Sequence, residues 1–392
     1  MRGAVALACA AALGLAAAQA GHEVSYYPSF YPQEIRIEPL DPQRAAQEFD
    51  SKTDPLHVYL GAAPRFAGNA PDHIRSVQSL GSLIVVSVDS RSQHAATRSA
   101  RCRLVGEAAA LLAERDGVVA YPHSITPYHA DYLHHSAFSE DAKPARIATA
   151  ASAFSFRLGD RSAPFVVAAA PIAAGGVADA DIEELPVADL LHAAGVGFNA
   201  WPAPPWSKEG WFQAYQALRP AIRADAAKRA DRLYDRLTHD EFSDAAERIN
   251  LERDLVAALT GGCERAIIGY RLRSDFYSDE FSNGIENLLV DSQAGFNTPV
   301  FVRTVKLKDF PWNGWLRLGI DVEPTAAWNP VGGFTDAAGR LVWSAVGDNA
   351  FLPIPYNSRW VANRVELRPG DGPRARQSFR IPADAMVPER AW

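Results

Sequence analysis

The chain has 392 residues, of which 48% are hydrophobic and 22% are charged, and its formal net charge is −7. This composition is ordinary for a globular protein, and the length is sufficient for two domains. A mildly acidic chain without basic runs is poorly suited to neutralising phosphates, so nucleic acid is excluded as the expected partner.

The first 20 residues have the three parts of an export signal. Arg2 precedes a short run of Ala, Leu and Val, which ends in the small-residue pattern Ala18-Gln19-Ala20. The run is too short and too rich in alanine for a membrane span, which needs ~20 strongly apolar residues. We predict cleavage after Ala20, leaving a periplasmic or secreted chain without a transmembrane segment; the alternative is an uncleaved anchor.

Strand and helix patterns alternate in the next part of the chain. Residues 82–88 are rich in β-branched residues and predict a strand, and 101–115 have apolar side chains at helical spacing. A further strand is predicted from 118–121. This order is typical of a βαβ unit with parallel strands, so we predict an α/β domain over residues 21–200.

Residues 201–262 are predicted to form a helical hairpin. Apolar residues recur at helical spacing on both sides of Thr238-His239-Asp240-Glu241, which fits a capping box at the start of the second helix. Gly261-Gly262 is expected to end that helix.

The remainder, residues 263–392, is predicted to be a β-rich domain. Asn313-Gly314 suits a type I′ turn, and it would join residues 300–310 and 315–322 into a hairpin. Residues 341–346 and 361–367 are predicted as further strands. The chain as a whole is therefore expected to be α/β, mixed α+β overall.

Two cysteines stay in the mature chain, because Cys9 leaves with the signal. An oxidising compartment permits a disulfide between Cys102 and Cys263, which would tie the two halves of the sequence together. The alternative is two separate buried thiols.

Histidines concentrate directly after the strand predicted at 118–121. Four of the ten histidines lie between residues 123 and 135. Asp131 and His135 would share a helix face, a spacing that lets a carboxylate and an imidazole bind one metal ion. Zinc or copper would suit such ligands. The candidate metal ligands are His94, His123, His129, Asp131 and His135. In the alternative interpretation these histidines cap helix carbonyls or lie in solvent, since no family motif such as H-E-x-x-H is present.

Three functions are compatible with these features. The leading hypothesis is an exported binding or accessory protein that holds a small molecule or a metal ion in a crevice between its halves. The second is a secreted metal-dependent hydrolase, with a metal-bound water as nucleophile. The third is a cell-envelope interaction protein that contacts its partner through the aromatic segment 26–31 and through tryptophans, all of which lie at or after Trp201.

Overall fold

The computed structural model describes residues 32, 34–112, 117–141, 154–160, 178–194, 204–310, 314–323, 337–346 and 351–362. The predicted signal peptide and the aromatic segment 26–31 lie outside these residues. No helix in the described ranges is long and apolar enough to cross a membrane.

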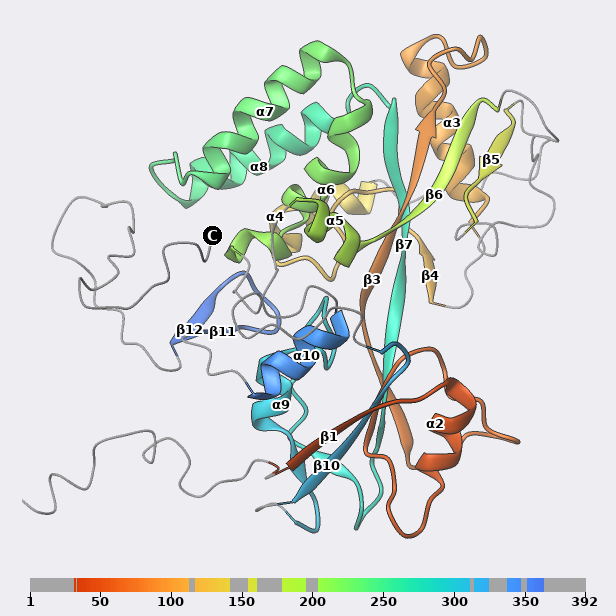
Figure 1. Ribbon diagram of the computed structural model, residues 1–392. Coiled ribbons are helices and arrows are strands. Elements are labelled where there is room, and N and C mark those ends of the chain that lie inside the picture. Colours follow the sequence, from red (N-terminus) through yellow and green to blue (C-terminus); the bar gives the residue numbers. More distant parts are fainter. Residues whose placement is uncertain are drawn as a thin grey trace, which may run out of the picture. The chain divides into compact units, whose positions relative to one another are not determined.

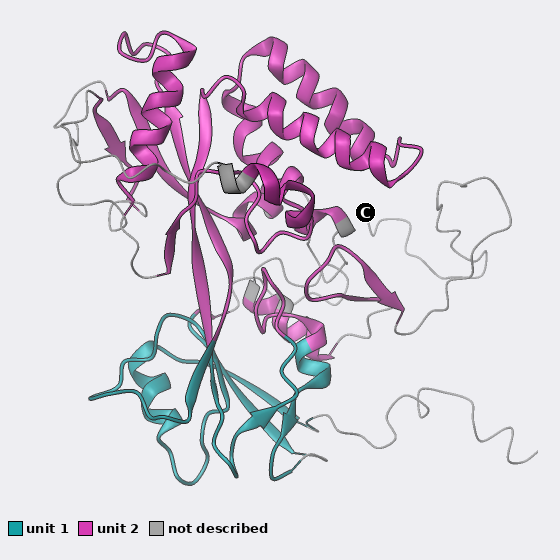
Figure 2. Cartoon of the chain, turned by 180° about the vertical axis from the view of Figure 1, so that it is seen from behind, with its two compact units in different colours: residues 1–76, 276–289, 301–321 teal, residues 77–275, 290–300, 322–392 magenta. Residues whose placement is uncertain are grey.

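The chain divides into two compact units, each built from separate stretches of sequence (Figure 2). Unit 1 comprises residues 1–76, 276–289 and 301–321, and unit 2 comprises residues 77–275, 290–300 and 322–392. The boundaries predicted at residues 200 and 262 divide the chain by type of secondary structure and stay a prediction.

Helices and strands are mixed along the chain, as predicted (Figure 1). The strands are β1 (Glu34–Pro39), β2 (Val58–Leu60), β3 (Ile74–Val88), β4 (Val118–Ala120), β5 (Phe156–Leu158), β6 (Ala180–Pro186), β7 (Arg265–Ser278), β8 (Ile285–Glu286), β9 (Lys306–Leu307), β10 (Trp315–Ile320), β11 (Phe351–Pro353) and β12 (Trp360–Ala362). The α-helices are α2 (Pro42–Phe49), α3 (Arg98–Ala110), α4 (Tyr132–Asp141), α5 (Val187–Ala193), α6 (Gly210–Leu218), α7 (Ala224–Thr238), α8 (Ala245–Thr260), α9 (Pro299–Thr304) and α10 (Ala337–Val346), and the 3-10 helices are η3 (Pro205–Lys208) and η4 (Arg219–Ala221).

Eight strands form one mixed sheet, which confirms the predicted α/β class. Their hydrogen-bonded order is β1-β10-β2-β7-β3-β6-β5, and β4 also pairs with β7. The long strands β3 and β7 pass through both units. β8 pairs with β9 and β11 pairs with β12, each in a separate antiparallel ladder.

In unit 2, β3 is covered by helices on both faces (Figure 1). Leu83 and Val85 belong to a hydrophobic cluster with α6, α7 and α8, whereas Ile84 and Val86 belong to a second cluster with α3. A strand buried on both faces needs no alternation of apolar and polar residues. This explains the continuous apolar run from which the strand was predicted.

The predicted βαβ unit is present in an altered form. β4 runs antiparallel to β7, and β3 and β7 run in opposite directions (Figure 1), with Val88 N donating to Glu264 O at 2.9 Å. β3 and β4 are therefore parallel to each other, as expected, but β7 lies between them. β7 comes from late in the sequence, and no local pattern could indicate that it lies between the two strands of the predicted βαβ unit.

The predicted helical hairpin is confirmed as α7 and α8, but its capping residues differ. Thr238 does not cap α8, because its hydroxyl donates to the Tyr234 carbonyl in the last turn of α7. The cap is Asp244, which accepts from Glu247 N at 2.8 Å, while the Glu247 carboxylate accepts from Ser243 N at 2.7 Å. A capping arrangement related to the predicted one thus exists a few residues later, with Glu247 bonding to the residue before the cap instead of to the cap itself.

Unit 1 packs α2 against its parallel strands. Asp41 caps α2 by accepting from two backbone N–H groups, and Pro42 occupies the first turn. Phe49 of α2 joins Leu56 and Tyr59 in a buried cluster.

The hairpin predicted around Asn313-Gly314 is wrong. Residues 299–304 form helix α9, and β10 pairs in parallel with β1 and β2. Val300, Phe301 and Val302 are all buried, a run that does not alternate as a one-sided strand would. Asn313 itself lies outside the described residues.

The strand predicted at 341–346 is also wrong, because these residues end helix α10. Leu341 and Ser344 are its buried side chains at this end, three residues apart as on a helix face. Of the strand predicted at 361–367, only the first two residues are described, and they belong to β12.

The predicted disulfide between Cys102 and Cys263 is present and joins residues 161 positions apart. It links α3 to the turn after α8, both in unit 2. The Arg101 guanidinium reinforces this link by donating to the Gly262 carbonyl at 2.9 Å.

Candidate metal centre

Asp131 is held in place by a helix to which it does not belong. It precedes α4, and its carboxylate accepts hydrogen bonds from Gly210 N at 2.7 Å and Trp211 N at 3.2 Å, in the first turn of α6. Free N–H groups and the helix dipole favour a negative charge at this position. The Glu209 side chain forms no capping hydrogen bond, so Asp131 takes that role.

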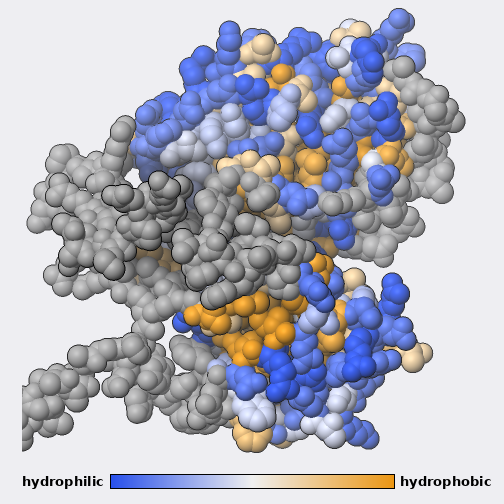
Figure 3. Space-filling view, viewed as in Figure 1, coloured by the Kyte–Doolittle hydropathy of each residue, from blue (hydrophilic) through white to orange (hydrophobic). Residues whose placement is uncertain are grey.

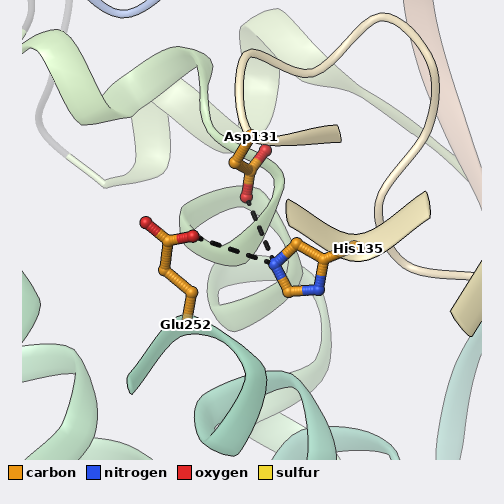
Figure 4. Close-up of side chains that lie close together, drawn as sticks. All are labelled: Asp131, His135 and Glu252. Atoms are coloured by element: carbon orange, nitrogen blue, oxygen red, sulfur yellow. Dashed lines mark ion pairs between the residues drawn. The ribbon is translucent and has the colours of Figure 1, made fainter. Parts of the chain in front are cut away.

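Asp131, His135 and Glu252 point toward one another in unit 2 (Figure 4). His135 lies one turn into α4 and Glu252 comes from α8. The His135 Nε2 atom is 3.9 Å from Asp131 Oδ2 and 4.0 Å from Glu252 Oε2, and one ligand atom from each residue lies within 4.8 Å of the others. The three side chains are 0–2% exposed.

The imidazole of His135 is neutral in this environment. Burial, together with the neighbouring His123, lowers its pKa to about 3. The contacts drawn in Figure 4 would be ion pairs only with a protonated ring, so they are contacts between a neutral ring and two carboxyl groups. A neutral ring keeps a nitrogen lone pair, which a metal ion requires.

His135 Nε2 has no hydrogen-bond partner among the described residues, although the side chain is only 2% exposed. Buried polar atoms are almost always paired, since leaving one unpaired costs roughly 1–3 kcal/mol. The atom therefore lacks the partner that its position demands.

Ionisation of the two buried carboxyl groups is also electrostatically unfavourable. Burial, together with the charge of nearby Glu209, raises the pKa of Asp131 to about 7. Two buried carboxyl groups facing each other disfavour double ionisation unless a cation lies between them.

Two further basic side chains contact the Glu252 carboxylate. His134 Nδ1 lies 2.7 Å from Glu252 Oε2, and this hydrogen bond raises the pKa of His134. Arg248 Nε lies 2.9 Å from Glu252 Oε1. Arg253 donates twice to the His134 carbonyl, at 2.9 and 2.6 Å, which fixes α4 against α8.

The five predicted ligands do not converge on one point. Asp131 and His135 come together, and His123 lies beside them with its ring centroid 6.4 Å from that of His135. His129 is fully paired instead: its Nδ1 accepts from Thr126 N at 2.8 Å, and its Nε2 lies 3.0 Å from Gln213 Oε1.

His94 belongs to a different part of unit 2. Its Nδ1 lies 3.1 Å from Asp179 Oδ1, and the side chain is 69% exposed. Asp179 also accepts from Ser155 N, so it orients the exposed ring of His94 toward solvent. No described residue adds another ligand there.

Glu252 is the member of this group that the sequence hypothesis missed. It stands at helical spacing from Leu255, Val256 and Leu259 in the buried stripe of α8. A carboxylate within an apolar stripe is rarely buried without a partner. That placement is the signal that could have identified it.

The donor set fits a divalent first-row metal ion. Metal–ligand distances of about 2.0–2.2 Å bring neighbouring ligand atoms to roughly 3–3.6 Å, so the observed contacts need to shorten by about 1 Å. Three protein ligands would leave one position of a tetrahedral ion open, and the near-complete burial suits the holding of an ion.

No family model and no curated protein matches the sequence. Among solved structures, the chain is distantly similar to NikZ from Campylobacter jejuni in complex with Ni(L-His), at a TM-score of 0.29 and 10% identity, covering 55% of this chain and 50% of that one. The periplasmic binding protein DppA from Helicobacter pylori, in complex with peptide STSA, gives a TM-score of 0.34 and 10% identity over 61% and 49% of the two chains. NikA from Staphylococcus aureus, in complex with Ni(L-His)2, gives 0.29 and 12% over 56% and 50%.

The chain thus matches only about half the length of each of these structures. Because all three TM-scores are below 0.5, the case for a function rests on the residues of this chain.

Proposed function

We propose that this protein is an extracytoplasmic metal-binding protein, and that Asp131, His135 and Glu252 hold one divalent first-row ion in unit 2. The observation that carries the proposal is the buried His135 Nε2, which has no hydrogen-bond partner among the described residues and faces two carboxyl groups at 3.9 and 4.0 Å. A cation among these atoms would satisfy the imidazole and offset the repulsion between the carboxylates.

A purely structural role for the three residues is less compatible with the geometry. A buried polar network that only supports the fold is normally fully hydrogen-bonded, as that of His129 with Thr126 and Gln213 is. His135 lies six residues after His129 in the sequence and lacks such a partner. The contrast between the two histidines favours a ligand role for His135.

The ligand types narrow the choice of ion. One imidazole and two carboxylates suit Zn²⁺ first, and Cu²⁺ is the second choice because imidazole also suits it. The proposed site lies within unit 2, and its burial favours a binding protein over the alternative metal-dependent hydrolase. The disulfide between Cys102 and Cys263 supports an oxidising compartment outside the cytoplasm.

Metal titration of the chelator-stripped protein tests the proposal. Isothermal titration calorimetry with Zn²⁺, Cu²⁺ and Ni²⁺ in turn is expected to give about one ion per chain for the preferred metal. His135→Ala is expected to weaken that binding about 100-fold or more, because it removes a ligand. The matched control is His239→Ala, at the exposed end of α7, which should leave affinity unchanged. Wild-type affinity in His135→Ala would contradict the proposal.

A further inference from the structure

Arg248 lies between two buried carboxylates, one of which is a proposed metal ligand. Its Nη2 contacts Glu209 Oε1, and its Nε is 2.9 Å from Glu252 Oε1. Glu209 and Glu252 are 2% and 0% exposed, whereas the Arg248 side chain is 32% exposed. Arg248 is thus a cation at the edge of the site that reaches inward to both acids.

The two oxygens of Glu252 have separate surroundings. Oε2 faces His135 and accepts from His134 Nδ1 at 2.7 Å, while Oε1 faces Arg248. Arg248 therefore compensates the charge of Glu252 without covering the oxygen that faces the proposed ion. This contact keeps Glu252 in position when no metal is bound.

Glu209 fixes the other end of Arg248. Its carboxylate accepts from Trp211 Nε1 and from Ser358 Oγ, the latter at 2.8 Å. These contacts hold Glu209 at the start of α6. The guanidinium is therefore kept beside Glu252 and cannot leave the site without losing its contact with Glu209.

On the basis of the proposed metal site, we propose that Arg248 is a resident cation that makes metal binding reversible. It stabilises the metal-free site by pairing with Glu252, and it repels the bound ion across the same carboxylate. Both effects lower the net affinity, because binding is measured relative to the metal-free state. The site is thereby suited to an ion that is taken up and released rather than held permanently.

The test removes the Arg248 charge without changing the net charge of the protein. The variant is Arg248→Met with Glu209→Gln, in which the glutamine can still accept from Trp211 Nε1 and bond to Ser358. The matched control is Arg229→Met with Asp254→Asn, which removes an exposed pair 3.8 Å apart on α7 and α8. Arg248→Gln is a second variant that removes the charge, and Arg248→Lys retains it.

The readout is the rate at which zinc-loaded protein releases Zn²⁺ to an excess of a colorimetric chelator, followed by stopped flow. We expect release to slow about tenfold or more in the double variant, because the repulsion between Arg248 and the bound ion is then removed and tenfold corresponds to only about 1.4 kcal/mol. Arg248→Gln should also slow release, whereas Arg248→Lys and the control pair should stay near the wild-type rate.

Release that is unchanged or faster in both charge-removing variants would overturn the role of Arg248. Equal slowing in Arg248→Lys would overturn it as well, because the charge is then not responsible. If the wild-type protein binds no metal, the proposed function itself fails, so the two failures are distinguishable.

Discussion

His57 is a buried histidine whose protonation opposes folding. Its Nδ1 accepts a hydrogen bond from Arg317 N at 2.9 Å. The residue is only 8% exposed, and this burial lowers the pKa of the imidazole to about 4. In the unfolded chain the pKa is ~6.5, so the unfolded state binds the proton first as pH falls. The contribution of neutral His57 to the free energy of unfolding is fully present above pH ~6.5. It is lost as pH falls toward 4, by up to about 3 kcal/mol.

The substitution His57→Asn should therefore flatten the loss of stability in acid. The asparagine oxygen can accept from Arg317 N but does not titrate. Urea unfolding at pH 7 and pH 4 is expected to show a smaller drop for His57→Asn than for wild type, by about 2–3 kcal/mol. The same drop in both proteins would show that His57 is not responsible. His239→Asn, on an exposed histidine, serves as the control.

His129 shows that an imidazole in the predicted ligand cluster can serve the fold alone. Both of its ring nitrogens have partners, and burial lowers its pKa to about 4. His129→Ala should destabilise the protein by about 2–4 kcal/mol, because it leaves a cavity and unpaired polar groups. The ratio of metal bound per chain should stay at the wild-type value. Loss of the metal with unchanged stability would make His129 a ligand instead.

Local sequence patterns correctly predicted the helices and strands whose own residues form a continuous apolar stripe or run. The apolar stripe of α8 and the β-branched run of β3 indicated their elements correctly. β10 was assigned to a hairpin because Asn-Gly is a strong local turn signal, yet the strand pairs with β1, about 280 residues earlier in the sequence. The same limit applies to Glu252. Its charge within a buried stripe was visible, but its partners come from a segment more than 110 residues earlier.

The disulfide stabilises the contact between α3 and the end of α8. It closes a loop of 161 residues, and loop closure of this size is worth ~2–4 kcal/mol. Replacing both Cys102 and Cys263 by alanine should lower the free energy of unfolding by about that amount, measured in denaturant. Adding a reductant should then change the stability of wild type but not of the variant. Equal sensitivity to reductant in both would contradict this account.

The fold joins two units through β3 and β7, yet the proposed ligands all lie in unit 2. A bound metal ion could therefore stabilise the molecule in either of two ways. If the long strands made both units unfold as one, ion binding would protect amides throughout the chain. If the units open separately, protection would be confined to the segments that carry the ligands.

We expect the second behaviour. At a free Zn²⁺ concentration of 100 times Kd, binding adds about 2.7 kcal/mol to any state that must lose the ion on opening. Hydrogen exchange should then slow by up to about 100-fold in α4, α8 and the first turn of α6, whose N–H groups hold Asp131. The parallel strands β1 and β10 and helix α2 of unit 1 should exchange as in the metal-free protein. His135→Ala should show no zinc-dependent change in either unit. Equal protection of β1, β10 and α8 would mean that the shared strands transmit stability between the units, because the ion has no ligand in unit 1 among the described residues.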